Sequence, residues 1–144
     1  MNNIEHIVAD FETCKRAAEM GFKIKTIFHW FKRDDDGEIS FTIETKRTDK
    51  FPSTAPAPTV EEVPLPFDKI FKYEKGYYEV KISHWVVEFD TSGGFGKSRQ
   101  AIKTSPNEAN ARLKMAIWLI ENVPEARQWY IDNGYLKEVS NDRD

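Results

Sequence analysis

The chain has 144 residues, of which 40% are hydrophobic and 31% charged, and this balance indicates one globular domain spanning residues 1–144. The formal net charge of −3 gives no overall attraction to nucleic acid or to an anionic membrane. Because Cys14 is the single cysteine, an intramolecular disulfide and a cysteine-based zinc cluster are excluded. The sequence shows no signal peptide and no apolar run long enough to span a bilayer, so we expect a cytoplasmic protein without membrane contact or cofactor.

The first predicted element is an amphipathic helix over residues 3–20, whose apolar side chains recur on one face at helical spacing. Gly21 followed by Phe22 is typical of a Schellman stop, in which the glycine adopts a left-handed conformation. Cys14 lies at the edge of the apolar face, and we expect it to be a small buried hydrophobic residue.

A β-hairpin is predicted over residues 23–45, turning at the acidic run that begins at Asp34. Its first strand has apolar side chains on both faces, which indicates either an interior strand or an exposed aromatic patch. Residues 46–66 contain five of the seven prolines and are predicted to be a connecting loop along one edge of the sheet. Within this loop, residues 59–62 match a short capping box and favour about one helical turn.

Residues 67–90 are aromatic and rich in β-forming side chains. The first part fits a hairpin turning at Lys75-Gly76 or a short helix that ends at Gly76, and we favour the hairpin. Residues 77–90 are predicted to form one strand with a bulge near Ser83-His84. A glycine-rich turn over residues 91–96 then leads into a last strand over residues 97–103.

The clearest helix is predicted over residues 105–123, with Ser105 as N-cap, Pro106 at the first position and Glu108 completing a capping box. Its apolar stripe is too wide for an exposed helix, so we expect it to lie across a sheet and to be buried on more than one side. Pro124 ends it.

A shorter helix is predicted over residues 125–133, followed by a second glycine–aromatic stop at Gly134-Tyr135 and a frayed tail over residues 140–144. The elements together predict an α+β fold. Its mainly antiparallel sheet would have four to five strands, with the N-terminal and C-terminal helices packed on one face.

The leading functional hypothesis is a non-enzymatic accessory protein that binds a protein partner or a second copy of itself. It depends on aromatic side chains in strands with two apolar faces, which would mark an interface if they were exposed. The candidate interface residues are Phe28, Trp30, Phe31 and Trp85.

A second hypothesis is weak binding of an anion or of single-stranded nucleic acid at the glycine-rich loop. The loop ends in Gly-Lys-Ser, as phosphate-binding loops do, but Thr91 stands where that motif requires its first glycine. Five basic residues against one acidic residue between positions 91 and 118 make the region locally positive. The candidate contacts are Lys97, Ser98, Arg99, Lys103 and Arg112, and a solvated charged surface explains them equally well.

A third hypothesis is an enzyme with an unrecognised site around His29 or His84, each of which precedes a tryptophan in a predicted strand. No nucleophile, histidine and carboxylate have a spacing that identifies a catalytic triad, so we assign no catalytic residue. His6, Asp10 and Cys14 recur every four residues, but three candidate ligands on one helix are weak evidence for a metal, and we assign no metal site.

The order of three features resembles small uncharacterised proteins carried by prophages and other mobile elements of gut bacteria. These features are the Gly21-Phe22 stop before an aromatic strand, the Pro56-Ala57-Pro58-Thr59 loop and the Ser105-Pro106-Asn107-Glu108-Ala109 start of a late apolar helix. Pro64 and Pro66 depart from the longer middle helix of that group. The resemblance implies a mobile-element context and assigns no functional residue.

Overall fold

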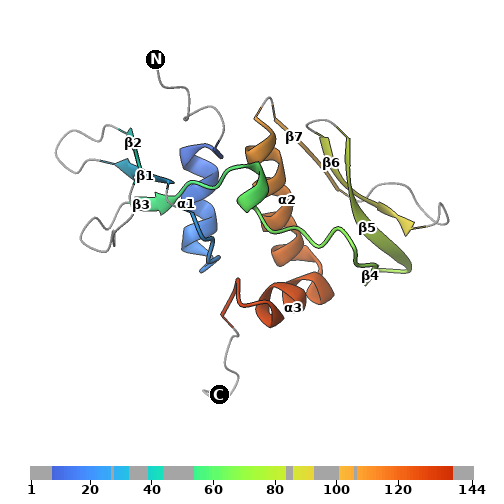
Figure 1. Ribbon diagram of the computed structural model, residues 1–144. Coiled ribbons are helices and arrows are strands. Elements are labelled where there is room, and N and C mark those ends of the chain that lie inside the picture. The colour runs from blue at the N-terminus through green and yellow to red at the C-terminus, as the bar shows by residue number, and fades with distance from the viewer. Residues whose placement is uncertain are drawn as a thin grey trace.

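The structure is a computed structural model that describes residues 8–26, 28–32, 39–43, 54–83, 86–92, 101–105 and 107–137. It has an α+β fold in which helices α1 and α2 lie side by side between two antiparallel sheets (Figure 1). The predicted fold class is therefore confirmed. The elements in chain order are α1 (Phe11–Glu19), β1 (Phe28–Lys32), β2 (Ile39–Ile43), β3 (Thr54–Pro56), the 3₁₀ turn η2 (Val60–Glu62), β4 (Phe71–Tyr73), β5 (Gly76–Ser83), β6 (Val86–Thr91), β7 (Ala101–Thr104), α2 (Glu108–Asn122) and α3 (Pro124–Asp132).

The strands form two sheets, where the sequence indicated one. One sheet has the order β2-β1-β3 and the other β4-β5-β6-β7. Helix α1 packs against β3, whereas α2 packs against β6 and β7, so each sheet is covered by a different helix. Both predicted hairpins are present: β1 pairs with β2, and β4 pairs with β5 around a turn between Tyr73 and Gly76.

The predicted single strand over residues 77–90 is wrong, because the chain reverses within it. Ser83 of β5 pairs with Val86 of β6, and the two strands continue as an antiparallel pair to Tyr78 opposite Thr91. The sequence between Ser83 and Val86 contains no glycine, asparagine or aspartate, the residues that usually mark a tight hairpin turn. Because β-forming residues continue through this point without a turn signal, the reversal could not be predicted from the local sequence.

Helix α1 begins at Phe11, later than the predicted start at residue 3. Asp10 is the N-cap: its backbone is extended, and its carboxylate accepts a hydrogen bond from the Thr13 N–H at 2.9 Å. The preceding Val8 forms an isolated β-bridge with Thr59. This pairing with the proline-rich segment keeps the backbone before Asp10 extended, and a local helical pattern could not predict it.

Both predicted glycine–aromatic stops are confirmed. Gly21 has a φ of +83°, and the Phe22 N–H donates to the Ala17 carbonyl at 3.0 Å, which is the long hydrogen bond of a Schellman motif. Gly134 also has a φ of +83° after α3, and Tyr135 makes the equivalent bond. Such a conformation strains any residue with a Cβ, so glycine is required at both positions.

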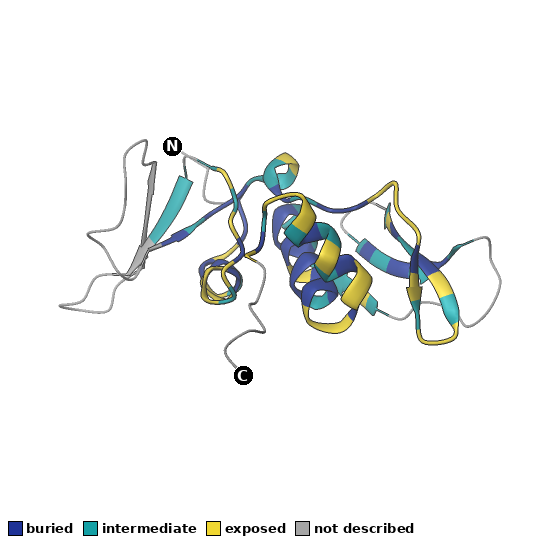
Figure 2. Cartoon of the chain, turned by 90° about the horizontal axis from the view of Figure 1, so that it is seen from below, coloured by how far each residue is buried: buried dark blue, intermediate teal, exposed yellow. Residues whose placement is uncertain are grey.

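Helix α2 is the centre of the core. Nine of its fifteen residues are buried, and they face both neighbouring layers, as the width of its apolar stripe predicted (Figure 2). It ends at Asn122, just before Pro124, also as predicted. Its N-cap is Asn107 and not Ser105, because the Asn107 side chain accepts the Asn110 N–H at 3.1 Å while the Ser105 hydroxyl accepts the Asn107 N–H.

The described part of the proline-rich segment, residues 54–66, belongs to the fold. Its first residues form β3, and the predicted single turn is η2, where the Thr59 N–H donates to the Glu62 carboxylate at 2.9 Å. Six of its apolar side chains are buried: Ala55, Ala57, Pro58, Val63, Leu65 and Pro66. The Tyr130 hydroxyl of α3 donates to the Pro64 carbonyl at 2.7 Å, so this connection joins the core of both sheets. The predicted tail over residues 140–144 lies outside the described residues.

Candidate functional site

The structure describes two of the four aromatic side chains that were predicted to form an interface. Phe28 and Trp30 are half-buried in β1 and pack against the core, and the Trp30 indole donates to the Ala9 carbonyl at 2.7 Å. Trp85 and the Phe31 side chain lie outside the described residues. Trp85 follows β5 of the four-stranded sheet, whereas Phe28 and Trp30 belong to the three-stranded sheet beyond α1 (Figure 1).

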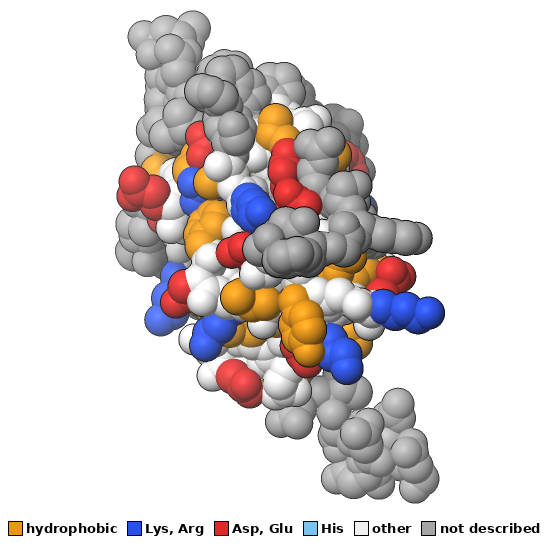
Figure 3. Space-filling view, turned by 90° about the vertical axis from the view of Figure 1, so that its right-hand side faces the viewer, with side chains coloured by type: hydrophobic (Ala, Val, Ile, Leu, Met, Phe, Trp, Pro, Cys, Tyr) orange, Lys and Arg blue, Asp and Glu red, His pale blue; other side chains and the backbone are white. Residues whose placement is uncertain are grey.

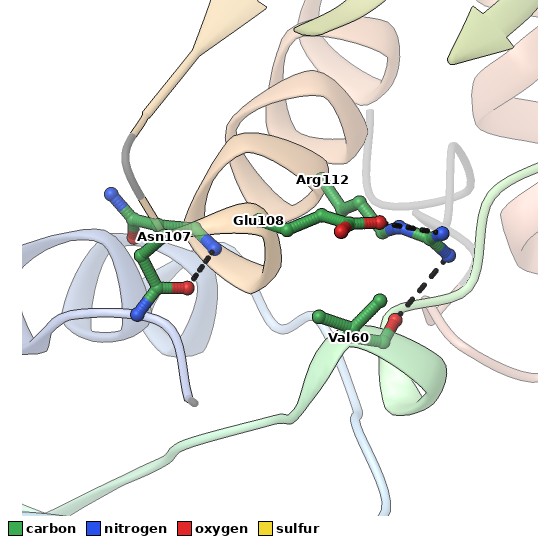
Figure 4. A network of polar contacts seen from close by, with 5 residues as sticks. Val60, Asn107, Glu108 and Arg112 are labelled. Carbon is green, nitrogen blue, oxygen red and sulfur yellow. Dashed lines mark hydrogen bonds and ion pairs between the residues drawn. The ribbon is translucent and has the colours of Figure 1, made fainter. Parts of the chain in front are cut away.

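The structure describes two of the five residues predicted to contact an anion, Lys103 and Arg112. Lys97, Ser98 and Arg99 lie outside the described residues. Arg112 points toward η2 (Figure 4). Its guanidinium donates to Glu108 of the same helix at 3.0 Å and to the Val60 carbonyl of η2 at 3.4 Å. Its two terminal nitrogens thereby join the proline-rich segment to α2.

Lys103 instead lies in an open groove of about 400 Å³ between α1, α2 and β7. Its side chain is on the same face of β7 as Ala101, which packs against the core. The residues that line the groove are Glu12, Thr13, Arg16, Lys103, Lys114, Ile117, Trp118 and Glu121. Four of these recur at three- and four-residue spacing on one face of α2, and Arg112 belongs to another face.

The apolar floor of the groove is rigid because Trp118 is held by other aromatic rings. Its ring lies 5.9 Å from the ring of Tyr73 and 5.7 Å from that of Phe89, measured between centroids. Ile117 beside it is buried, while Trp118 stays half-exposed toward the groove. An indole fixed in this way can cover an apolar group of a ligand with little loss of side-chain entropy.

Charged side chains surround this floor. Arg16 of α1 pairs with Glu121 of α2, which ties the two helices together across one part of the groove. In the part of the chain that the structure describes, no carboxylate lies within 4.0 Å of the ammonium groups of Lys103 or Lys114. These two lysines are therefore available for a negatively charged ligand, whereas Glu12 adds one negative charge to the rim.

The relative position of the groove walls is fixed where α1 and α2 begin. The Asn110 side chain, 3% exposed, accepts the Asp10 N–H and donates to the Asp10 carboxylate, both at 3.0 Å. The Asn107 amide donates to the Val8 carbonyl at 2.6 Å in the same cluster. These bonds join residues that are about one hundred positions apart in the sequence, so they hold the two helices side by side at their N-terminal ends.

Strand β7 borders the groove as an edge strand. Among the described residues it pairs only with β6, from Val86 opposite Thr104 to Phe89 opposite Ala101. On the outer face of the sheet, Tyr77 of β5 and Ile102 of β7 are 59% and 45% exposed, and β6 lies between these two strands. On this side of the molecule, hydrophobic side chains are interspersed with charged ones (Figure 3). Phe67 and Ile70 are also exposed, at 39% and 58%, but the groove is a hollow that combines an aromatic ring with charged side chains, so it is the better candidate for a binding site.

Of the other predicted chemical groups, Cys14 and His29 are described, whereas His6 and His84 lie outside the described residues. Cys14 is buried, as predicted, and its thiol contacts the Ala9 carbonyl at 3.4 Å; burial, with a contribution from Asp10, raises the pKa of this thiol. His29 pairs across the sheet with Thr42 and Pro56, neither of which is ionisable. Within the described ranges, no three histidine, cysteine or acidic side chains gather as metal ligands.

Comparisons of the chain with protein-family models, with curated proteins and with solved structures found no match. None of the helices among the described residues is long and apolar enough to cross a bilayer. The geometry of the groove therefore carries the functional argument. The sequence contained one signal for it: Lys114, Ile117, Trp118 and Glu121 place an aromatic ring among charges on a single helix face.

Proposed function

We propose that the protein is a binding module that captures another protein through the groove between α1, α2 and β7. The observation that carries this proposal is the half-exposed Trp118, which neighbouring rings hold in place beside two lysines with no described ion pair. Interfaces concentrate their binding energy in such fixed aromatic anchors, and the surrounding charges select the partner.

The charges of the groove favour a protein segment over a nucleic acid. Its basic side chains are Arg16, Lys103 and Lys114, but Glu12 and Glu121 lie on the same surface and would repel successive phosphates. A protein segment can place one carboxylate near the lysines and an apolar side chain over Trp118. The net charge of −3 supports the same choice.

The proposal includes the setting that the sequence pattern suggested, namely a cytoplasmic accessory protein of mobile-element origin. No catalytic step is assigned to it. A second copy of the chain is a competing occupant of the groove, and the experiment below distinguishes the two.

The test is selection of a display library of random peptides against the wild-type protein, with binding then measured for Lys103→Glu/Lys114→Glu. We expect enriched peptides to lose at least about tenfold in affinity for this double variant. Lys69→Glu/Lys72→Glu is the matched control, because both lysines are exposed outside the groove. Failure to enrich any peptide that distinguishes the groove variant from the control would refute the proposal, as would self-association that the groove variant abolishes.

A further inference from the structure

We propose that the occupant of the groove is an extended acidic segment of the partner, added to the four-stranded sheet as a further strand beside β7. This inference rests on the proposed function and specifies its ligand. It follows from two features of the groove: the edge of β7 and the face on which its side chains lie.

The edge of β7 supplies the backbone groups for strand addition. In the described part of the chain β7 has β6 on one side and no strand on the other. An edge strand presents a row of N–H and C=O groups that an extended peptide can pair with. The groove lies between α1 and β7, so a strand added on this edge would pass over Ile117 and Trp118 of α2.

The side chains of β7 predict the sequence of the added strand. Ala101 and Lys103 face α2, while Ile102 and Thr104 face outward. Every second residue of the added strand would share the face of Lys103. On that face, a carboxylate would lie near Lys103 and Lys114, and a neighbouring apolar side chain would cover Trp118. In the preferred segment, every second residue therefore belongs to the inner face, and these inner residues are acidic or apolar.

The backbone groups at the edge of β7, and not the size of the groove, favour an extended segment over a helix. One helical turn with its side chains is about 10 Å across and about 5 Å long, so a single turn would fill most of the 400 Å³. An extended segment matched to the four residues of β7 also fits, and in addition it satisfies the backbone groups of the edge.

The same lysine argues against a second copy as occupant. Two β7 strands placed edge to edge would bring Lys103 of one copy toward Lys103 of the other, and like charges across paired strands are destabilising. A charged residue on an edge strand thus discourages self-pairing, whereas a single carboxylate placed beside Lys103 is attracted to it.

The test uses the peptides enriched in the selection above, synthesised with blocked ends and N-methylated at one backbone amide at a time. Strand addition predicts a loss of at least about tenfold for methylation at alternate positions and little change at the positions between them. It also predicts that a peptide with lysine in place of its acidic inner residue does not bind the wild-type protein but does bind the Lys103→Glu variant. As a control, the lysine-substituted peptide is tested against the Lys69→Glu variant, which it should not bind.

Peptides that bind the groove but tolerate N-methylation at every position, or that bind as helices, would overturn strand addition while leaving the proposed function intact. The absence of any groove-dependent peptide would refute the proposed function itself. The two failures are therefore distinguishable.

Discussion

The hydrogen-bonded pair of Asp10 and Asn110 holds the N-terminal ends of α1 and α2 together, so Asn110→Ala is the most informative test of the fold. The substitution removes one bond from a backbone N–H and one to a carboxylate, both of 3.0 Å. A neutral hydrogen bond contributes about 1 kcal/mol and one to a charged group about 2 kcal/mol. Because Asp10 is exposed and water can replace part of the loss, we expect a cost of about 2–3 kcal/mol.

Urea unfolding followed by circular dichroism measures this cost. With a slope of about 2 kcal/mol per molar urea, the midpoint should fall by about 1 M. Asn122→Ala is the matched control: its amide donates to the Trp118 carbonyl on an exposed helix surface, and its loss should cost no more than about 0.5 kcal/mol. In a double-mutant cycle with Asp10→Ala, which removes the carboxylate but keeps the backbone N–H of residue 10, the coupling reports the side-chain bond alone and should be about 1–2 kcal/mol. A coupling near zero together with an unchanged urea midpoint for Asn110→Ala would refute the view that this pair clamps the helices.

Three further predictions concern stability. Tyr130→Phe removes the bond to the Pro64 carbonyl and should cost about 1–2 kcal/mol in urea unfolding, whereas the exposed Tyr77→Phe should cost almost nothing; equal costs would contradict the role of that bond. Burial raises the pKa of the Cys14 thiol, so the folded state keeps its proton above the unfolded pKa of about 8.5, and stability should fall with rising pH by up to about 1.4 kcal/mol per pH unit. In Cys14→Ala, stability should begin to fall only at about pH 10, where tyrosine and lysine side chains titrate. An unchanged pH profile would show that the thiol is not the source of the fall. Gly21→Ala should cost about 1 kcal/mol through backbone strain alone, because an added Cβ meets no atom within 4 Å; a neutral effect on the thermal midpoint would contradict the Schellman assignment.

The parts of the fold that the sequence predicted are those set by neighbouring residues. A glycine followed by an aromatic residue marked the ends of α1 and α3, since only glycine adopts the required φ without strain. The body of α2 was predicted because its apolar spacing extends over fifteen residues. The hairpin around Gly76 was predicted because its turn signal lies in neighbouring residues.

The parts that the sequence did not predict depend on contacts between distant residues. Ser105 and Asn107 are both good N-caps, and Asn107 caps α2 in a cluster where it also bonds to the Val8 carbonyl, about one hundred positions away. The division of the strands into two sheets follows from the position of the two helices between them. The groove was missed because its lining comes from three separate elements, so Lys103 could not be associated with Trp118 from the sequence alone.

The most direct test of the binding groove is an NMR titration of the full chain with a peptide enriched in the selection. The groove predicts that the indole N–H of Trp118 and the amides of Lys103 and Arg16 show the largest shifts, while Trp30 and its neighbours in β1 are unchanged. Largest shifts in β1, with Trp118 unchanged, would contradict the proposed site and would place the binding surface on the three-stranded sheet.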